Sequence, residues 1–206
     1  MPFQQILDRS LSRWSRLVLA ALVIPLALAY TAPIWRIHLV APQYPAGLTM
    51  DIWTYKVVGG DDGQHIQEIN TLNHYIGMSP IDRKALSDLD WIPFALAVLG
   101  FLALRVAAIG NVRSLVDLAV LASFFVIVSG GRFVYMLYSF GHNLAPDAPV
   151  TIDPFMPVVV GTKQIANFTT SSYPLLGSFL MGAFIAGVVG VTLWQLVAFR
   201  RRGVPV

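Results

Sequence analysis

The segment WIPFALAVLGFLALRVAAI, from Trp91 to Ile109, decides the class of this protein, because its only charged residue is Arg105. The hydrocarbon core of a bilayer is about 30 Å thick, and an α-helix needs about 20 mainly apolar residues to cross it. The sequence therefore predicts an all-α integral membrane protein with four transmembrane helices. The four spans are expected at residues 17–35, 91–109, 115–140 and 173–199.

The composition of the whole chain agrees with this class. Of the 206 residues, 56% are hydrophobic and only 12% are charged, against about 25% charged in a typical soluble domain. So few charges do not cover a soluble globule of this size, and so much apolar content is not typical of a disordered chain. The sequence has no cysteine, which excludes disulfides, zinc–thiolate sites, iron–sulfur clusters and a catalytic thiol.

The basic residues predict the orientation in the membrane rather than a nucleic-acid site. They gather in residues 1–16, around the short connection 110–114 and in the tail 200–206. Basic flanks stay on the cytoplasmic side, so we expect both termini in the cytoplasm of a bacterium. The loops 36–90 and 141–172 are then periplasmic, facing outward from the inner membrane. The first apolar run is too long for a signal peptide and has no clear cleavage site, so we expect it to be retained.

The two long loops share a pattern that suggests an internal duplication. Residues 38–45 and 142–149 both read H-x-V/L-A-P-x-x-P, and a Val-Val-Gly triplet follows at 57–59 and 159–161. Each loop lies between an outgoing and a returning helix, so a duplication predicts two parallel two-helix repeats. The alternative is convergence, since Pro and Ala are common after helices.

Loop one contains the signals of a small folded cap. Residues 48–58 are rich in Ile, Trp, Thr, Tyr and Val with rough alternation, which is typical of a strand. A turn follows at 59–63, residues 65–76 carry apolar side chains at helical spacing, and Gly77 favours a helix stop. We therefore expect a small mixed α/β cap on the outward side.

His74 and Met78 are the candidate metal ligands. Four residues apart on the predicted helix, their imidazole and thioether groups would share one face. This soft ligand set favours copper, particularly Cu(I), which is the one cofactor that the sequence suggests. The alternative is structural, with His74 bonded to loop backbone and Met78 packed at the membrane surface. Additional ligands would come from Met50, Met156, His38, His65 or His142.

Arg132 lies inside the third predicted span. Placing a charged side chain in a bilayer costs free energy, so such a residue is a candidate functional polar site. Asp117 on the same helix would be about 22 Å away, so we expect a partner on another helix, a backbone carbonyl or the outer membrane face. A structural role and a contact with a quinone or lipid headgroup are both open.

Small residues recur at every fourth position of the last span. Such a stripe lets two helices approach closely. It predicts helix packing, either within the bundle or against another membrane subunit. Its members are Ser178, Gly182, Ala186 and Gly190.

Aromatic residues of loop one predict a docking surface. Both long loops exceed the 2–8 residues usual between the helices of a bundle. Trp53, Tyr55 and Tyr75 supply side chains that dominate interface hot spots. The alternative is an aromatic belt at headgroup level, which we expect less for Trp53 and Tyr55 because they lie well inside the loop by sequence.

Two motifs of loop one carry a family resemblance: APQYPxGL at residues 41–48 and EINxLNHYIGM at residues 68–78. Together with the number of spans and the second loop, they resemble NosB, a family of small membrane proteins associated with clade II nitrous oxide reductase gene clusters. The resemblance implies an accessory or partner protein of a periplasmic copper enzyme that reduces nitrous oxide. The composition and spacing of the residues do not show this chemistry by themselves.

Three functional hypotheses follow. The first is a membrane-embedded accessory or anchor protein whose periplasmic loops dock a redox partner, which by the resemblance is nitrous oxide reductase. The second is a copper-handling or maturation factor for that enzyme, and the third is a quinol-linked electron-transfer subunit with Arg132 near the headgroup. The sequence has no Walker, GxSxG or HExxH motif, so we do not predict an enzyme.

Overall fold

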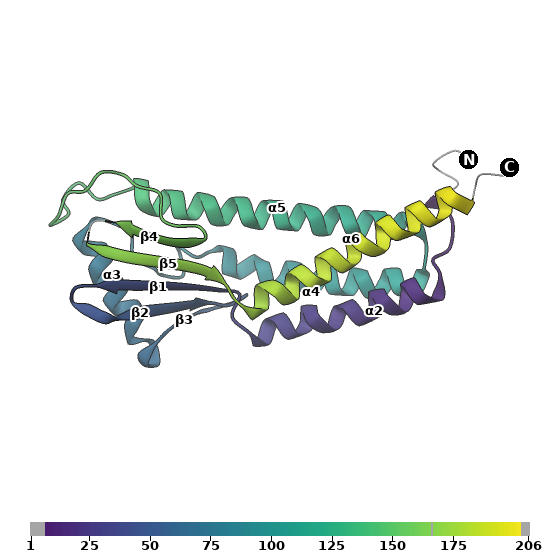
Figure 1. Ribbon diagram of the computed structural model, residues 1–206, viewed down its shortest axis with the longest axis horizontal. Coiled ribbons are helices and arrows are strands. Elements are labelled where there is room, and N and C mark those ends of the chain that lie inside the picture. Colours follow the sequence, from purple (N-terminus) through teal and green to yellow (C-terminus); the bar gives the residue numbers. More distant parts are fainter. Residues whose placement is uncertain (1–6, 166, 203–206) are drawn as a thin grey trace.

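A bundle of helices and a β-sheet follow one another along the long axis of the molecule (Figure 1). The computed structural model describes residues 7–165 and 167–202, with side chains of the last helix described as far as residue 198. Within these residues four helices are long and apolar enough to cross a membrane, as predicted. They are α2 (Arg13–Leu28), α4 (Asp88–Ile109), α5 (Val112–His142) and α6 (Leu176–Arg202).

The four helices form a ring in which α2 and α5 each pack against both α4 and α6. The chain turns between α4 and α5 within two residues, because Gly110 adopts a left-handed conformation with φ +71° and Asn111 caps the next helix by accepting from the Ser114 N–H at 2.9 Å. The largest side chains with almost no exposed area lie at the centre of the ring. They are Leu19, Leu96, Leu115, Val112, Phe184 and Val188.

One antiparallel sheet contains strands from both long loops. Its strands are β1 (Trp35–Ala41), β2 (Tyr44–Ile52), β3 (Val57–Gly59), β4 (Gly161–Ile165) and β5 (Phe168–Pro174), in the order β3-β2-β1-β5-β4. The central strand β1 pairs with loop one on one side, where His38 faces Thr49, and with loop two on the other, where His38 faces Ser171. The two loops therefore form a single unit.

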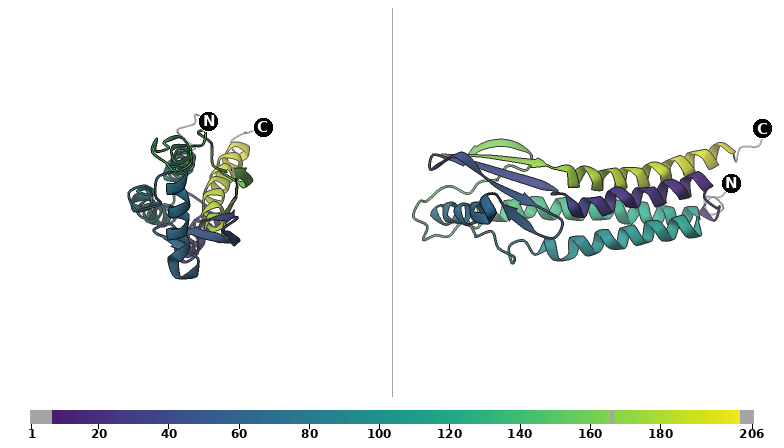
Figure 2. Two further views of the ribbon diagram at one scale, coloured as in Figure 1. Left: turned by 90° about the vertical axis from the view of Figure 1, so that its left-hand side faces the viewer. Right: turned by 90° about the horizontal axis from the view of Figure 1, so that it is seen from below.

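The helix α3 (Gln64–Tyr75) crosses one face of this sheet, roughly across the long axis of the bundle (Figure 2). It follows the short 3₁₀ turn η2 (Asp61–Gly63). Alternate residues of the strands point toward α3 and form a second apolar core, and the other face of the sheet carries mainly polar side chains. The buried members of this core are Ala41, Leu48, Met50, Ile52, Ile69, Leu72, Leu86 and Leu89.

The cap contains more strand than the sequence predicted. The predicted strand at 48–58 is two strands, β2 and β3, separated by a turn, whereas the helix predicted at 65–76 agrees with α3 to within one residue. The first span ends earlier than expected, with α2 followed by the 3₁₀ turn η1 (Ala29–Thr31), so Trp35 starts β1. Likewise Tyr173, predicted to begin the last span, belongs to β5.

The motif shared by the two loops does not form a repeated structure, which corrects the predicted duplication at this point. Residues 38–45 make the hairpin between β1 and β2. Residues 142–149 instead leave the end of α5 and continue without helix or strand to β4. The shared proline and alanine residues therefore occur in two different chain turns. The pattern does not support two structurally related halves.

Candidate functional site

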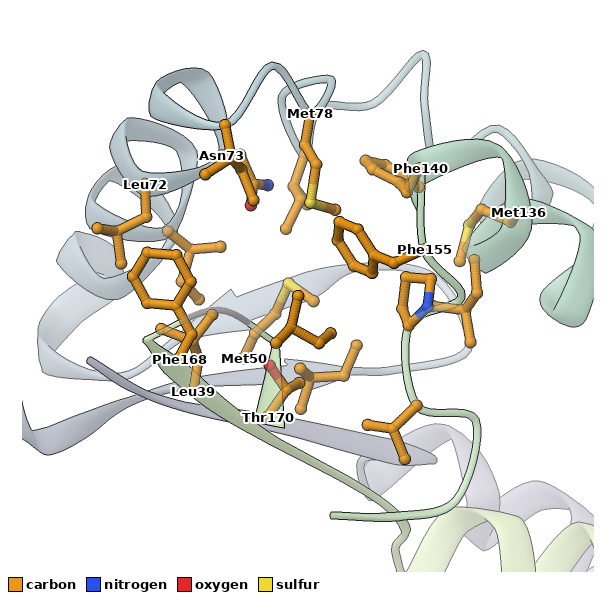
Figure 3. Close-up of a pocket in the computed structure, with 18 of the residues that line it drawn as sticks. Leu39, Met50, Leu72, Asn73, Met78, Met136, Phe140, Phe155, Phe168 and Thr170 are labelled. Atoms are coloured by element: carbon orange, nitrogen blue, oxygen red, sulfur yellow. The ribbon is translucent and has the colours of Figure 1, made fainter. Parts of the chain in front are cut away.

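An apolar cavity of about 110 Å³ lies inside the cap, between the sheet, α3 and the carboxyl-terminal end of α5 (Figure 3). Three methionines from different elements line it: Met50 from β2, Met78 from the segment after α3, and Met136 from α5. Asn73 is only 5% exposed and also lines the cavity, and its Nδ2 group has no hydrogen-bond partner among the described residues. The cavity thus presents thioethers and one amide donor in apolar surroundings.

His74 and Met78 do not form the predicted pair on one helix face. The helix α3 ends at Tyr75, and Gly77, with φ +78°, turns the chain so that the Met78 N–H bonds to the Asn73 carbonyl at 2.8 Å. Met78 then extends into the cavity, whereas His74 is exposed and does not line it. The helical spacing behind the predicted site therefore fails, because the helix stops between the two residues.

The remaining histidines have separate surroundings. His65 Nδ1 lies 3.0 Å from the Thr49 backbone nitrogen, from which it accepts a hydrogen bond. His142 stacks on Tyr138 with ring centroids 3.8 Å apart. Within residues 7–165 and 167–198 no three His, Cys, Asp or Glu side chains gather into a possible metal site. Met50 is therefore the one additional ligand named from the sequence that shares a cavity with Met78.

Trp53 and Tyr55 lie close to the helices, not at the far end of the cap. They occupy the turn after β2, whose last residue Ile52 pairs with Trp35 at the start of β1. Their rings meet edge to face at 6.4 Å, and Lys56 Nζ lies 4.8 Å from the Trp53 ring centroid. From the sequence we expected these two residues away from the membrane interface, because they lie far from the spans along the chain. That expectation is wrong, because β2 brings the chain back to where the helices begin. Aromatic rings beside a lysine at this level are typical of a membrane-interface belt.

Tyr75 does not join those two residues on one patch. It stands at the carboxyl end of α3 with 54% of its area exposed. Its carbonyl accepts a hydrogen bond from the Val150 N–H at 3.0 Å, which ties α3 to loop two. The Trp53–Tyr55 turn is instead tied to the start of α4, because Arg83 donates to the Tyr55 carbonyl and pairs with Asp90.

Arg132 has its partner on another helix, as the sequence argument favoured over Asp117. Its Nε donates to Asp88 Oδ1, and this carboxylate also accepts from Trp91 Nε1 at 2.7 Å. Asp88 is the first residue of α4, so Arg132 lies level with the sheet end of that helix. The ion pair is therefore at the end of the apolar span and not at its centre.

Within the described residues, the predicted small residues of α6 do not make a close helix contact. Gly182, Ala186 and Gly190 are exposed, and a Cβ added to either glycine would meet no atom within 4 Å. Ser178 instead donates to the Ile34 carbonyl at 2.6 Å. α6 instead approaches α2 closely at Gly187, the residue after Ala186, where an added Cβ would lie 2.4 Å from the Leu22 side chain. Of the two predicted roles, packing within the bundle is wrong for these three residues.

The uncovered face of the sheet is a feature that sequence reasoning missed. We call it the open face; its side chains are Arg36, His38, Val40, Thr49, Asp51, Val58, Thr162, Gln164, Thr169, Ser171 and Tyr173. Arg36 forms two hydrogen bonds of 2.6 Å with Asp51, and this contact raises the pKa of the Arg36 guanidinium. The strand alternation that creates this face was hidden because β4 has only five residues and β5 is rich in Thr and Ser.

Comparison with protein-family models gives no match, and comparison with curated proteins gives none either.

Proposed function

We propose that this chain is an integral protein of the bacterial inner membrane, with the sheet end outside the cytoplasm. The support is the position of charge along the four apolar helices. Arg13, Arg16 and Arg113 all lie at the end of the bundle opposite the sheet, and basic residues favour the cytoplasmic side. The cap then faces the periplasm.

The orientation is tested by labelling single cysteines in a chain that has none of its own. Asp62 is exposed in the cap, and Ile109 is 51% exposed at the opposite end of α4. A membrane-impermeant maleimide should label Asp62→Cys in intact spheroplasts and Ile109→Cys only after lysis. Labelling of both positions before lysis would refute the four-span topology.

The second part of the proposal is that the cap docks a periplasmic redox enzyme. The observation that carries it is the joining of both loops into one five-stranded sheet with an uncovered polar face. Five strands at about 4.8 Å spacing and about 20 Å length give roughly 500 Å² of flat area, most of the 800 Å² or so that each partner contributes to a standard interface. Non-obligate interfaces are about as polar as other protein surface, so the Thr and Ser content is compatible with docking.

The motifs at 41–48 and 68–78 supply the identity of the proposed partner. They resemble NosB, so we take copper-dependent nitrous oxide reductase as the enzyme to test. Both motifs lie in the cap: the first forms the turn from β1 to β2, and the second runs from α3 to the cavity residue Met78. The chain would hold the soluble enzyme at the membrane surface as an anchor.

The docking proposal is tested by placing one large charged side chain at the centre of the open face. Ser171→Arg lies on β5 between β1 and β4 and points outward, so the sheet tolerates it. Gln67→Arg, exposed on α3, is the matched control on the opposite layer. Binding of purified nitrous oxide reductase to nanodisc-embedded protein should fall at least tenfold for Ser171→Arg and stay unchanged for Gln67→Arg. Equal binding by both variants would refute docking at this face.

A second candidate function is copper handling, favoured by the three methionines in the cap cavity. Thioether sulfur is a soft ligand that selects Cu(I), and in Figure 3 Met50 and Met78 extend from opposite walls into the same space, with Met136 on a third wall. The test is Cu(I) affinity by competition with a chromogenic chelator. Met78→Leu keeps the volume and removes the sulfur, and Met156→Leu, outside the cavity lining, is its control. Equal Cu(I) affinity in both variants would refute this site.

A further inference from the structure

Two adjoining cavities lie where the outer ends of the helices meet the sheet, and both are lined by Asp88 and Met136. The larger has a volume of about 340 Å³ and lies between α4, α5 and α6 with an almost wholly apolar lining. The smaller has a volume of about 230 Å³ and is partly polar. Its polar lining comes from Asp88, Arg132, Tyr135 and three serines, Ser79, Ser87 and Ser139. An apolar chamber beside a polar one matches the shape of an amphiphile.

The Arg132 guanidinium in the polar chamber is held at one edge only. Its Nε donates to Asp88, and among the described residues neither of its Nη groups has a hydrogen-bond partner. The side chain is 52% exposed, so these donors face outward into the chamber region. A guanidinium with two free parallel donors fits the oxygen atoms of a phosphate group.

The apolar chamber is not filled by the chain itself. Gly130 of α5 and Gly182 of α6 line it, and a Cβ added to either would meet no atom within 4 Å. The Ser129 hydroxyl on the same wall is buried without a hydrogen-bond partner among the described residues. The chamber is open on one side, since Gly130 and Gly182 are both exposed, and its volume of about 340 Å³ lies in the range of ligand pockets. These observations indicate a space that an apolar chain occupies.

We propose that these two chambers bind one phospholipid of the outer leaflet. The Arg132 Nη groups bind its phosphodiester, with Ser79 and Ser87 beside it, and an acyl chain enters the space between Gly130 and Gly182. Asp88 lines the same chamber, and its carboxylate accepts a hydrogen bond from the ammonium group of a phosphatidylethanolamine headgroup. The inference rests on the membrane insertion proposed above, but it is independent of docking to a redox enzyme.

The experiment uses delipidated full-length protein in detergent, mixed with phosphatidylethanolamine or phosphatidylglycerol and measured by native mass spectrometry. Gly182→Phe fills the apolar chamber without changing a charge. Gly190→Phe is its control, two turns along the same exposed face of α6 and outside the cavity lining. Because hydrogen bonds to charged groups contribute about tenfold in affinity or more, Arg132→Gln should weaken binding by a similar factor, with Arg113→Gln at the opposite end as its control.

The expected result is that Gly182→Phe and Arg132→Gln each retain about tenfold less phospholipid, while both controls match the wild type. Retention of either phospholipid supports the proposal, and a preference for phosphatidylethanolamine supports the ammonium contact with Asp88. If Gly182→Phe binds phospholipid as the wild type does, or if added menaquinone displaces the lipid, the proposal is overturned. Failure of membrane insertion would be seen separately, as protein released from membranes by alkaline carbonate.

Discussion

Replacing Ser172 by alanine tests whether the two long loops are stabilised as one unit. Ser172 lies in β5 of loop two and has no exposed area. Its hydroxyl accepts a hydrogen bond from Trp35 Nε1 at 2.7 Å and donates one to the Val159 carbonyl at 2.9 Å. One hydroxyl thus connects the first strand of loop one to two segments of loop two, and alanine removes both bonds without adding volume.

The expected cost follows from the groups left behind. The Trp35 indole N–H and the Val159 carbonyl would each lose a partner, and a buried polar group left unpaired costs about 1–3 kcal/mol. Allowing for relaxation, we expect a total loss of about 2–4 kcal/mol. At about 2–4 °C per kcal/mol for a chain of this size, the apparent Tm should fall by about 4–16 °C.

The measurement is thermal unfolding of detergent-solubilised protein, followed by tryptophan fluorescence. Ser171→Ala is the matched control, because the neighbouring hydroxyl points to the open face and its hydrogen bond within the described residues is to the exposed Thr162. Exposed substitutions of this kind change stability by about 0.5 kcal/mol or less, so its Tm should move by about 1–2 °C. Equal Tm values for the two variants would refute the reasoning that Ser172 joins the loops.

Two further predictions use the same melting assay. Gly141→Ala should lower the Tm by several degrees, because its Cβ would lie 2.0 Å from the Phe155 carbonyl oxygen and force loop two away from α5. Gly131→Ala is the control: its Cβ would meet no atom within 4 Å, so it should raise stability by up to about 1 kcal/mol. A higher Tm for Gly141→Ala than for Gly131→Ala would contradict this packing. The hydrogen bond to Glu68 raises the pKa of the Tyr44 hydroxyl, so its stabilisation is complete below the unfolded-state pKa of about 10 and is lost as pH rises through the higher folded-state pKa. The Tm advantage of the wild type over Tyr44→Phe should therefore shrink above pH 10, and a constant difference between pH 7 and 11 would exclude this linkage.

Local sequence patterns predicted the elements whose formation depends on local properties. The four long helices follow from apolar runs of sufficient length, and α3 follows from helical spacing between a glycine–aspartate turn and Gly77. The strand pattern at 48–58 located part of the sheet, although Trp53 and Tyr55 proved to be a turn inside it. The span boundaries were displaced where an apolar run continues from helix into strand, since hydropathy does not distinguish Trp35 in a sheet from the same residue in a helix.

Contacts between distant segments were decided by the tertiary structure alone. The pairing of β1 with β5, the convergence of Met50, Met78 and Met136, and the ion pair of Arg132 with Asp88 each join residues far apart in the chain. That four helices are apolar enough to span a membrane could be read from the sequence, because helix length and hydropathy are properties of one continuous segment. The sequence did not determine which strand lies beside β1, because backbone N–H and C=O groups are nearly the same in every residue and strand partners are selected by the packing of the whole cap.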